Sequence, residues 1–527
     1  MHQAEIIVLL FTVVGVLAVV AHKISLPYPI VLVLGGLALS FVPRLPAVNL
    51  NPDVVFYFIL PALIYPAALF TSWRDFQRNL RPILTLAIGL VLATTLAVAW
   101  IAHSIVPALP LAAAFALGAI VSPPDAVAAT AIIRRLGVPH RIQVILEGES
   151  LVNDATALVA LQFAIAALVT GTFSPAYAAG RFVWAAAGGI GIGLLVGVAM
   201  RWVQSHLDNP PIQITFSLLT PFIAYLPAEQ MHASGVLATV AAGIFLGWHS
   251  PLIMSARTRL QAYAFWETIV FLLNGFVFIV IGLQLPRIVH AWNRESLTGV
   301  FMSAIVICAT VILARFAWVI PATYLSRLLK IERHARDSTP SWQHVAIVGW
   351  AGMRGVVSLA AAFALPLAMP TGQTFPGRDY ILFVAFSVIL VTLVLQGLTL
   401  PALIRKLGVP GDAQTDDEER LARLEANKEA LKWIAETRAK SDSSPEAIDR
   451  LRAEYDERIE QLEHCADNPD ECRGEIATPR YQRLQHQALR IERKTIIRLR
   501  NERVINDDAL RRIQRDLDLA EARLTGS

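Results

Sequence analysis

The stretch Ala-Ile-Val-Ser-Pro-Pro-Asp-Ala-Val-Ala-Ala-Thr, residues 119–130, lies inside an apolar segment that extends over about 110–134. An apolar segment of this length is expected to form a helix that crosses a bilayer, since about 20 such residues suffice. Pro123 and Pro124 remove backbone donors and clash with the preceding turn, so the helix must break there. Broken helices are tolerated at membrane depth only where the freed backbone lines a protein cavity. Because Asp125 adjoins the break, the stretch favours a binding site over a simple kink.

The charges divide the chain into two parts. Residues 1–410 contain 23 basic and 14 acidic side chains, whereas residues 411–527 contain 22 basic and 27 acidic ones. The first part has 37 charged residues in 410 positions, a much smaller share than the roughly 25% of soluble domains. It is therefore not a conventional soluble fold and is typical of a polytopic membrane protein. The second part is a polar appendage. The basic residues of the first part sit in short loops, which excludes a nucleic-acid-binding surface.

Apolar runs long enough to span a bilayer predict an all-α membrane protein with about 13 transmembrane helices. Their approximate ranges are 4–22, 28–43, 53–70, 81–106, 110–134, 142–170, 181–203, 212–228, 234–249, 262–285, 299–328, 343–369 and 380–405. The second and ninth runs are short, so the number could be twelve. The first run has no preceding Lys or Arg and no small-residue cleavage site, so we expect a retained helix rather than a signal peptide.

Loop charges predict the orientation of these helices. The loops that follow odd-numbered runs hold 16 Lys and Arg residues, and those that follow even-numbered runs hold 5. Lys and Arg accumulate on the cytoplasmic side, so we expect the N-terminus outside and the charged tail in the cytoplasm. Three cysteines are too few for a disulfide framework and fit a reducing compartment for the tail.

The sixth run begins with the polar sequence Glu-Gly-Glu-Ser-Leu-Val-Asn-Asp at residues 147–154. Helical spacing places Ser150 one turn from Asp154. A carboxylate and a hydroxyl on one face are hard oxygen ligands suited to a small monovalent cation such as Na⁺, and Asn153 can hold the neighbouring backbone. Burial favours the uncharged form of a carboxyl group, so Asp154 could hold either a proton or a partly dehydrated cation.

The twelfth run contains Gly-Trp-Ala-Gly-Met-Arg-Gly-Val-Val-Ser at residues 349–358. Glycines at this density let helices pack closely or permit an unwound stretch. Arg354 needs a carboxylate partner at this depth, and Glu149 is the first choice for a structural ion pair. Arg315 and Glu267 also lie in predicted spans, but near ends from which they are expected to reach the interface.

The two interrupted runs occupy corresponding positions. Runs one to six and eight to thirteen form two sets of six joined by the seventh, so their topologies are inverted, and each interruption is in the fifth member of its set. Paired interruptions of this kind are the best sequence indication of a secondary-transporter site. Opposed half-helix ends leave partial charges in the membrane, and Asp125 is placed to balance the positive ends.

Three motifs carry a resemblance to a known family. Ser-Pro-Pro-Asp-Ala-Val-Ala-Ala-Thr-Ala-Ile at 122–132, Glu-Ser-Leu-Val-Asn-Asp-Ala at 149–155 and Gly-Met-Arg-Gly-Val-Val-Ser-Leu at 352–359 resemble the signatures of NhaP-type bacterial sodium/proton antiporters, over roughly residues 5–408. The resemblance implies an NhaA-like inverted-repeat fold, a homodimer in the bacterial inner membrane and an elevator-like movement. It also implies Asp154 as the shared ion and proton site, and pairing of Glu149 with Arg354.

Two positions differ from the pattern of many relatives. Pro124 and Ala126 stand where those relatives have Thr and Pro around the acid, so a threonine hydroxyl ligand is missing. Pro66 stands where others have a glutamate in the third span. The resemblance therefore implies less about cation coordination and selectivity than about the fold.

Residues 411–527 contain no apolar run long enough to span a membrane, and their leucines recur at helical intervals, as at Leu421, Leu424 and Leu431. Helical hairpins are predicted, with breaks near 441–445 and 467–470. A regulatory or partner-binding role is one interpretation, and a solvated helical face is the other.

The sequence therefore predicts a secondary antiporter, not an enzyme, that exchanges cytoplasmic Na⁺ for external H⁺ in pH and sodium homeostasis and needs no cofactor. Li⁺ or K⁺ are alternative cations. A K⁺/H⁺ exchanger or an organic-anion symporter on the same scaffold is the main alternative, and a non-transporting membrane sensor is another. An intramembrane protease is disfavoured because the chain lacks the Gly-x-Gly-Asp motif.

Overall fold

The computed structural model of this 527-residue chain describes almost entirely helical structure. The described residues are 3–24, 26–42, 52–171, 174–290, 294–328, 341–369, 374–409, 413–438, 445–467 and 480–502, with a few more between 513 and 520. The chain forms two compact units, Met1–Asp412 and Ala413–Ser527. The division falls two residues after the boundary predicted from the charges.

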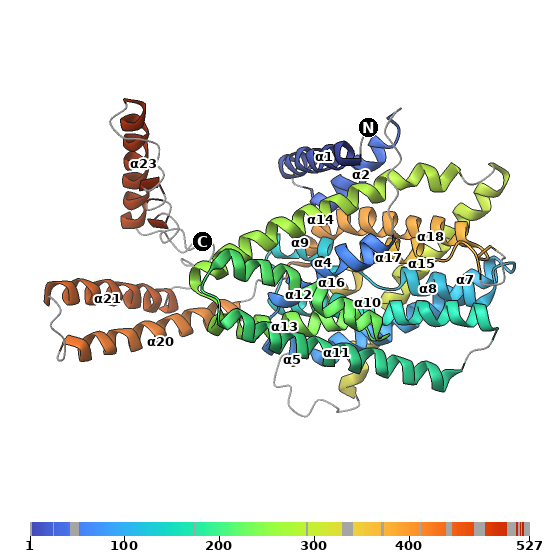
Figure 1. Cartoon of the computed structure of the whole chain (residues 1–527), viewed down its shortest axis with the longest axis horizontal. Helices are drawn as coiled ribbons and strands as arrows, with labels where there is room; N and C mark the ends of the chain where they lie inside the picture. Colours follow the sequence, from blue (N-terminus) through green and yellow to red (C-terminus); the bar gives the residue numbers. More distant parts are fainter. Residues whose placement is uncertain are drawn as a thin grey trace. The chain divides into compact units, whose positions relative to one another are not determined.

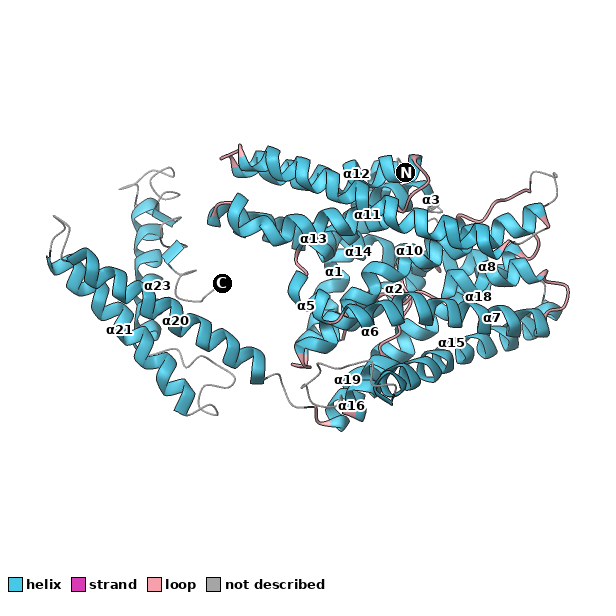
Figure 2. Ribbon diagram, turned by 90° about the horizontal axis from the view of Figure 1, so that it is seen from below, coloured by secondary structure: helices cyan, strands magenta, loops and turns pink. Residues whose placement is uncertain are grey.

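The first unit is a bundle of long apolar helices (Figures 1 and 2). Its helices are α1 (Gln3–Lys23), α2 (Tyr28–Leu39), α3 (Pro52–Val54), α4 (Leu60–Leu69), α5 (Trp73–Arg78), α6 (Leu80–Leu84), α7 (Val91–Ile105), α8 (Leu111–Val121), α9 (Ala126–Arg135), α10 (His140–Thr170), α11 (Pro175–Ser205), α12 (Pro210–Gln230), α13 (Gly235–Ile253), α14 (Ala256–His290), α15 (Arg294–Leu328), α16 (Trp342–Trp350), α17 (Val356–Phe363), α18 (Arg378–Val391) and α19 (Gly397–Leu407). Three π-helical turns join neighbouring helices: η1 (Val55–Ile59), η2 (Thr85–Leu90) and η3 (Thr392–Gln396).

Within the described residues, ten helical segments are long and apolar enough to cross a membrane. All ten overlap runs that the sequence predicts as spans. Two more predicted runs are the shorter apolar helices Val8–Lys23 and Tyr28–Leu39. The predicted run at 343–369 is divided between α16 and α17, and neither half is long enough to cross alone.

Both predicted interruptions are present. The first broken helix ends as α8 at Val121 and resumes as α9 at Ala126, so Pro123 and Pro124 lie in the break. The second ends as α16 at Trp350 and resumes as α17 at Val356. Each break therefore places one helix C-terminus and one helix N-terminus inside the unit, and these ends need partners for their unpaired backbone groups.

Glycines allow the helices of this unit to pack closely. A Cβ atom on Gly193 of α11 would collide with the backbone carbonyl of Ala238 in α13, and one on Gly282 of α14 would collide with that of Val33 in α2. Small residues at helix contacts are typical of membrane bundles, where close packing replaces the hydrophobic effect between helices. The largest group of buried side chains lies around α8, α14, α15, α17 and α18.

The second unit contains α20 (Ala413–Arg438), α21 (Pro445–Asp467) and α23 (Arg480–Asn501). Helices α20 and α21 lie side by side as a hairpin (Figures 1 and 2), joined by a Lys428–Glu463 ion pair of 3.0 Å. Leu424 and Ile434 are buried there, whereas Leu421 is exposed. Of the predicted breaks near 441–445 and 467–470, Pro445 and Asp467 are described, as the first and last residues of α21, and the other residues lie outside the described ranges.

Candidate functional site

The two broken helices meet at their interruptions. The backbone N–H of Asp125, in the first break, donates to the carbonyl oxygen of Met353, in the second, over 2.7 Å. Prolines in the first break and glycines in the second interrupt the helices, so backbone groups there are free to form this bond. Segments more than 200 positions apart in the sequence are thus joined at one point in the interior of the unit.

The carboxylate of Asp125 lies at the N-termini of both resumed helices. Its Oδ1 accepts a hydrogen bond from the Val127 N–H of α9 over 2.8 Å, and the carboxylate also accepts one from the Val356 N–H of α17. Helix N-termini carry partial positive charge and unpaired N–H groups, so one carboxylate satisfies both ends. Gly355 makes this possible, because a Cβ atom there would collide with Asp125 Oδ2.

Arg354 binds the C-terminal end of α8, the helix that precedes the first break. Its side chain is fully buried, and its Nε and Nη2 donate to the carbonyls of Val121 and Ser122 at the end of α8, over 3.0 and 3.3 Å. Its Nη1 donates to the carbonyl of Gly352. A guanidinium group at a helix C-terminus neutralises the partial negative charge of the last carbonyls.

The ion pair that we predict between Glu149 and Arg354 is corrected by the structure, which pairs Glu149 with Arg315. Arg315 Nη1 donates to Glu149 Oε1 over 2.6 Å and Nη2 donates to Oε2 over 2.8 Å. Its Nε donates to the carbonyl of Val348 in the last turn of α16. The sequence predicts that Arg315 reaches the interface, but in the structure its side chain is fully buried. Glu267 is exposed.

The depth of Arg315 in an apolar run indicates that it needs a partner, but not which one. The site has three carboxylates, Asp125, Glu149 and Asp154, so a count of charges does not fix the pairs. The position of Arg315 along α15 says nothing about which neighbouring helix it faces, because that depends on how α15 packs against α10 and α16.

Helix α10 brings the remaining predicted ligands to the break. Asn153 is fully buried and its Nδ2 donates to the carbonyl of Pro124 over 2.8 Å, so the amide holds the broken backbone as the sequence suggests. Ser150 is partly buried, and its Oγ accepts from the Ala126 N–H over 3.4 Å. Asn153 Oδ1 has no hydrogen-bond partner in the described part of the chain.

Asp154 lies one residue further along α10, with only 7% of its surface exposed. It is close enough to Asp125 for the two carboxylates to interact electrostatically, and it also interacts with the ring hydroxyl of Tyr225 on α12. Buried like charges disfavour each other, so the pair favours binding of a proton or a cation. The sequence gives no indication of Tyr225, because only packing brings α12 to this position.

A further residue of the site is Thr392. It begins the π-helical turn η3, and its Oγ1 accepts from the Arg354 backbone N–H over 3.1 Å. Turns of this type often occur at functional sites. A threonine inside an apolar run gives no sequence signal for this role.

The third-span position that differs from the family pattern has no carboxylate nearby on α4. Pro66 is buried inside α4, next to Tyr65, whose ring packs against Trp266 at 5.4 Å between centroids. Across the described residues, no group of three or more His, Cys, Asp or Glu side chains is arranged to hold a metal ion.

Comparisons with known proteins identify the family of the chain. Residues 7–406 match the family model described as sodium/hydrogen exchanger, transmembrane. An uncharacterised Na⁺/H⁺ exchanger of Mycobacterium tuberculosis is 36% identical, over 98% of this chain and 96% of the relative. A sodium, potassium, lithium and rubidium/H⁺ antiporter of Bacillus subtilis is 35% identical, over 87% of this chain and 69% of its own.

The solved structure of the sodium/proton antiporter of Methanocaldococcus jannaschii at pH 8 matches 77% of this chain and 99% of its own, with a TM-score of 0.62 and 20% identity. That likeness shows a shared fold for the first unit. The family model covers nearly the whole of that unit, and the relatives extend the match into the tail. The chain therefore belongs to the sodium/hydrogen exchanger family of membrane antiporters.

Proposed function

We propose that the chain is a secondary antiporter that exchanges cytoplasmic Na⁺ for external H⁺ and that both ions bind in turn at Asp154. Li⁺ and K⁺ are the alternative cations, and the relative named for sodium, potassium, lithium and rubidium supports a broad selectivity. The exchange would serve pH and sodium homeostasis.

The observation that carries this proposal is the balance of buried charges around the breaks. Glu149 is neutralised by Arg315, and the carboxylate of Asp125 is held at two helix N-termini, which carry partial positive charge. Asp154 has no cationic partner among the described residues. One negative charge therefore remains, and either one proton or one monovalent cation neutralises it.

The other predicted ligands have supporting roles in this proposal. Ser150 would offer its hydroxyl and Asn153 its unbonded Oδ1 to the cation, while Asp125 and the Pro124 carbonyl would hold the break in the shape that exposes these oxygens. Oxygen ligands of this kind suit hard cations. The core would cross the membrane when Asp154 is neutralised and would not cross when it is bare.

The finer architecture is also part of the proposal. Thirteen membrane spans in two inverted sets of six, an elevator-like movement of a core bundle, and a homodimer in the bacterial inner membrane are consistent with the two meeting breaks. The N-terminus would lie outside and the charged tail in the cytoplasm, following the distribution of Lys and Arg in the loops.

Fluorescence dequenching in everted vesicles tests the proposed exchange. Vesicles that contain the chain and an acidic lumen should lose their proton gradient when Na⁺ is added, and parallel additions of Li⁺ and K⁺ would rank the cations. Empty vesicles are the control. The absence of a response to all three cations, with the protein inserted and folded, would refute cation/proton exchange.

A further inference from the structure

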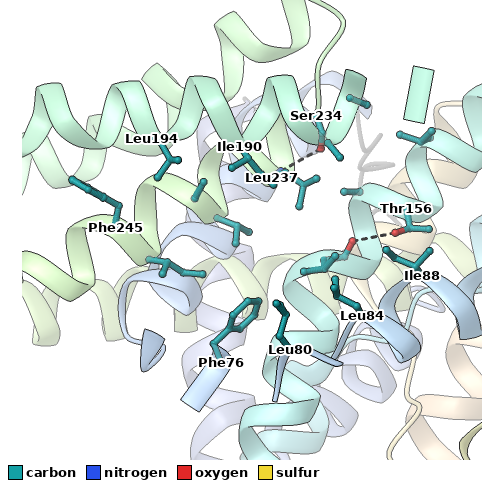
Figure 3. Close-up of a pocket in the computed structure, with 18 of the residues that line it drawn as sticks. Phe76, Leu80, Leu84, Ile88, Thr156, Ile190, Leu194, Ser234, Leu237 and Phe245 are labelled. Atoms are coloured by element: carbon teal, nitrogen blue, oxygen red, sulfur yellow. Dashed lines mark hydrogen bonds between the residues drawn. The ribbon is translucent and has the colours of Figure 1, made fainter. Parts of the chain in front are cut away.

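One cavity of the membrane unit is lined by no residue of the meeting breaks. It has a volume of about 540 Å³ and is bounded on one side by α5, α6, η2 and α10, and on the other by α11 and α13. Figure 3 shows Phe76, Leu80 and Leu84 facing Ile190 and Leu194 across this space. We call it the α10–α13 cavity.

The lining of the α10–α13 cavity is apolar. Its two hydroxyl groups are already bonded to the backbone: Thr156 Oγ1 donates to the Val152 carbonyl over 3.5 Å, and Ser234 Oγ accepts from the Leu237 N–H over 3.2 Å (Figure 3). No lining carboxylate is present. An ion would lose its hydration here without compensation, so the cavity suits an apolar occupant.

The cavity is long and follows the helices. Its lining on α13 extends from Ser234 to Trp248, which corresponds to about 21 Å along a helix. On α11 the lining extends from Phe182 to Leu194, or about 18 Å. A space of this length within a membrane bundle fits an extended hydrocarbon chain lying roughly parallel to the helices.

One end of the cavity has the features of a membrane interface. Trp73 and Trp248 line it with 37% and 48% of their surfaces exposed, and tryptophan favours the level of lipid headgroups. The guanidinium of Arg74 lies 5.4 Å from the centroid of the Trp248 ring. Arg74 is exposed, and no ion pair is formed by it within the described part of the chain. Such a guanidinium is suited to bidentate binding of a phosphate group.

We propose that the α10–α13 cavity binds one acyl chain of an anionic phospholipid whose phosphate is held by Arg74. The apolar lining accounts for the chain, and the exposed cation beside two tryptophans accounts for the headgroup. The occupant would contact Val152, Ala155 and Thr156, which lie on the helix that carries Asp154. It would thus fill the space between α10 and the α11/α13 pair and restrain movement between them.

Photo-crosslinking tests this proposal without measuring transport, so its failure is distinguishable from failure of the proposed exchange. The full chain is reconstituted in phosphatidylethanolamine vesicles that contain phosphatidylglycerol with a diazirine in its acyl chain, and adducts are mapped by mass spectrometry. We expect adducts on residues 152–159 of α10. Excess unlabelled phosphatidylglycerol should compete, and palmitate at the same concentration should not.

Two matched pairs of variants define the site. Ile190→Trp fills the cavity and should remove the adducts on 152–159, whereas Leu195→Trp, on the same helix but 72% exposed and outside the lining, should not. Arg74→Gln should weaken labelling about tenfold, which corresponds to roughly 1.4 kcal/mol of binding free energy. Arg78→Gln, on the same short helix, should leave it unchanged. If Ile190→Trp does not fold, Ala241→Phe fills the same cavity.

The opposite results would overturn the proposal. The first is that the wild-type chain gives no adducts on 152–159. The second is equal labelling of Ile190→Trp and Leu195→Trp, and the third is equal labelling of Arg74→Gln and Arg78→Gln. Competition by palmitate as strong as that by phosphatidylglycerol would make a free fatty acid the occupant. Cross-links between two chains that carry a photoreactive side chain at position 190 would make a second copy the occupant.

Discussion

Arg315 and Glu149 form a bidentate ion pair in the interior of the membrane unit, with Nη1–Oε1 and Nη2–Oε2 distances of 2.6 and 2.8 Å. The two side chains are 0% and 1% exposed. Arg315 also binds the Val348 carbonyl, so the pair connects α10, α15 and the last turn of α16. It fixes the helix that carries Asp154 to one of the two broken helices.

Neutralising one partner of this pair should destabilise the protein strongly. Glu149→Gln or Arg315→Met leaves an uncompensated buried charge, at a cost of roughly 3–5 kcal/mol, whereas the double variant should recover part of the loss. Thermal unfolding in detergent measures the effect. The control is the surface pair Arg134–Glu147, whose disruption should cost less than about 1 kcal/mol. Additive losses for Glu149 and Arg315 would contradict the contact.

Replacing Gly355 by alanine should disturb the breaks. The added Cβ atom would collide with Asp125 Oδ2 and push the carboxylate away from the N–H groups of Val127 and Val356. Overpacking of this kind costs about 1–3 kcal/mol, and we expect most of the exchange activity to be lost. Melting temperature and vesicle dequenching measure both effects. The control is Gly191→Ala on α11, which has open space around it. Equal melting temperatures and equal exchange activities of Gly355→Ala and Gly191→Ala would refute the close approach of Gly355 to Asp125.

Removal of the tail should not abolish exchange. A chain that ends at Asp412 keeps the whole first unit, and every proposed ion ligand lies within it. It should insert and transport, with an altered response to pH or salt if the tail regulates. Transport at several pH values, in truncated and full-length chains, measures this. A well-folded truncation without any activity would show that the tail is part of the transport machinery.

The breaks are predictable from the sequence because their signals are local. Pro123 and Pro124 cannot continue a helix wherever they lie, and Asp154 and Glu149 stand out as acids in an apolar run. The predicted partner of Glu149 is wrong because ion pairing across 166 positions depends on how helices rotate against each other. Thr392 and Tyr225 escaped notice for the same reason, since threonine and tyrosine are unremarkable in apolar helices until packing brings them to a charged group.

The exchange should be electrically silent. Asp154 is the single buried carboxylate of the site that no arginine or helix end neutralises, so one Na⁺ or one H⁺ should give the moving core the same net charge. A net charge moved per cycle would be worth about 2.3 kcal/mol per 100 mV. A potential imposed with valinomycin on proteoliposomes should therefore leave the Na⁺/H⁺ equilibrium unchanged. A shift with voltage would show that Asp125 or Glu149 also titrates.

The most direct test of the central claim is Na⁺-driven proton movement in proteoliposomes that contain Asp154→Asn. The substitution keeps the shape and hydrogen-bonding capacity of the side chain but removes its titratable charge. We expect a monodisperse, folded protein with exchange reduced to the level of empty liposomes, while Glu147→Gln, at a partly exposed position of the same helix, should transport like the wild type. Wild-type rates from the Asp154→Asn chain would contradict the assignment of Asp154 as the shared ion and proton site.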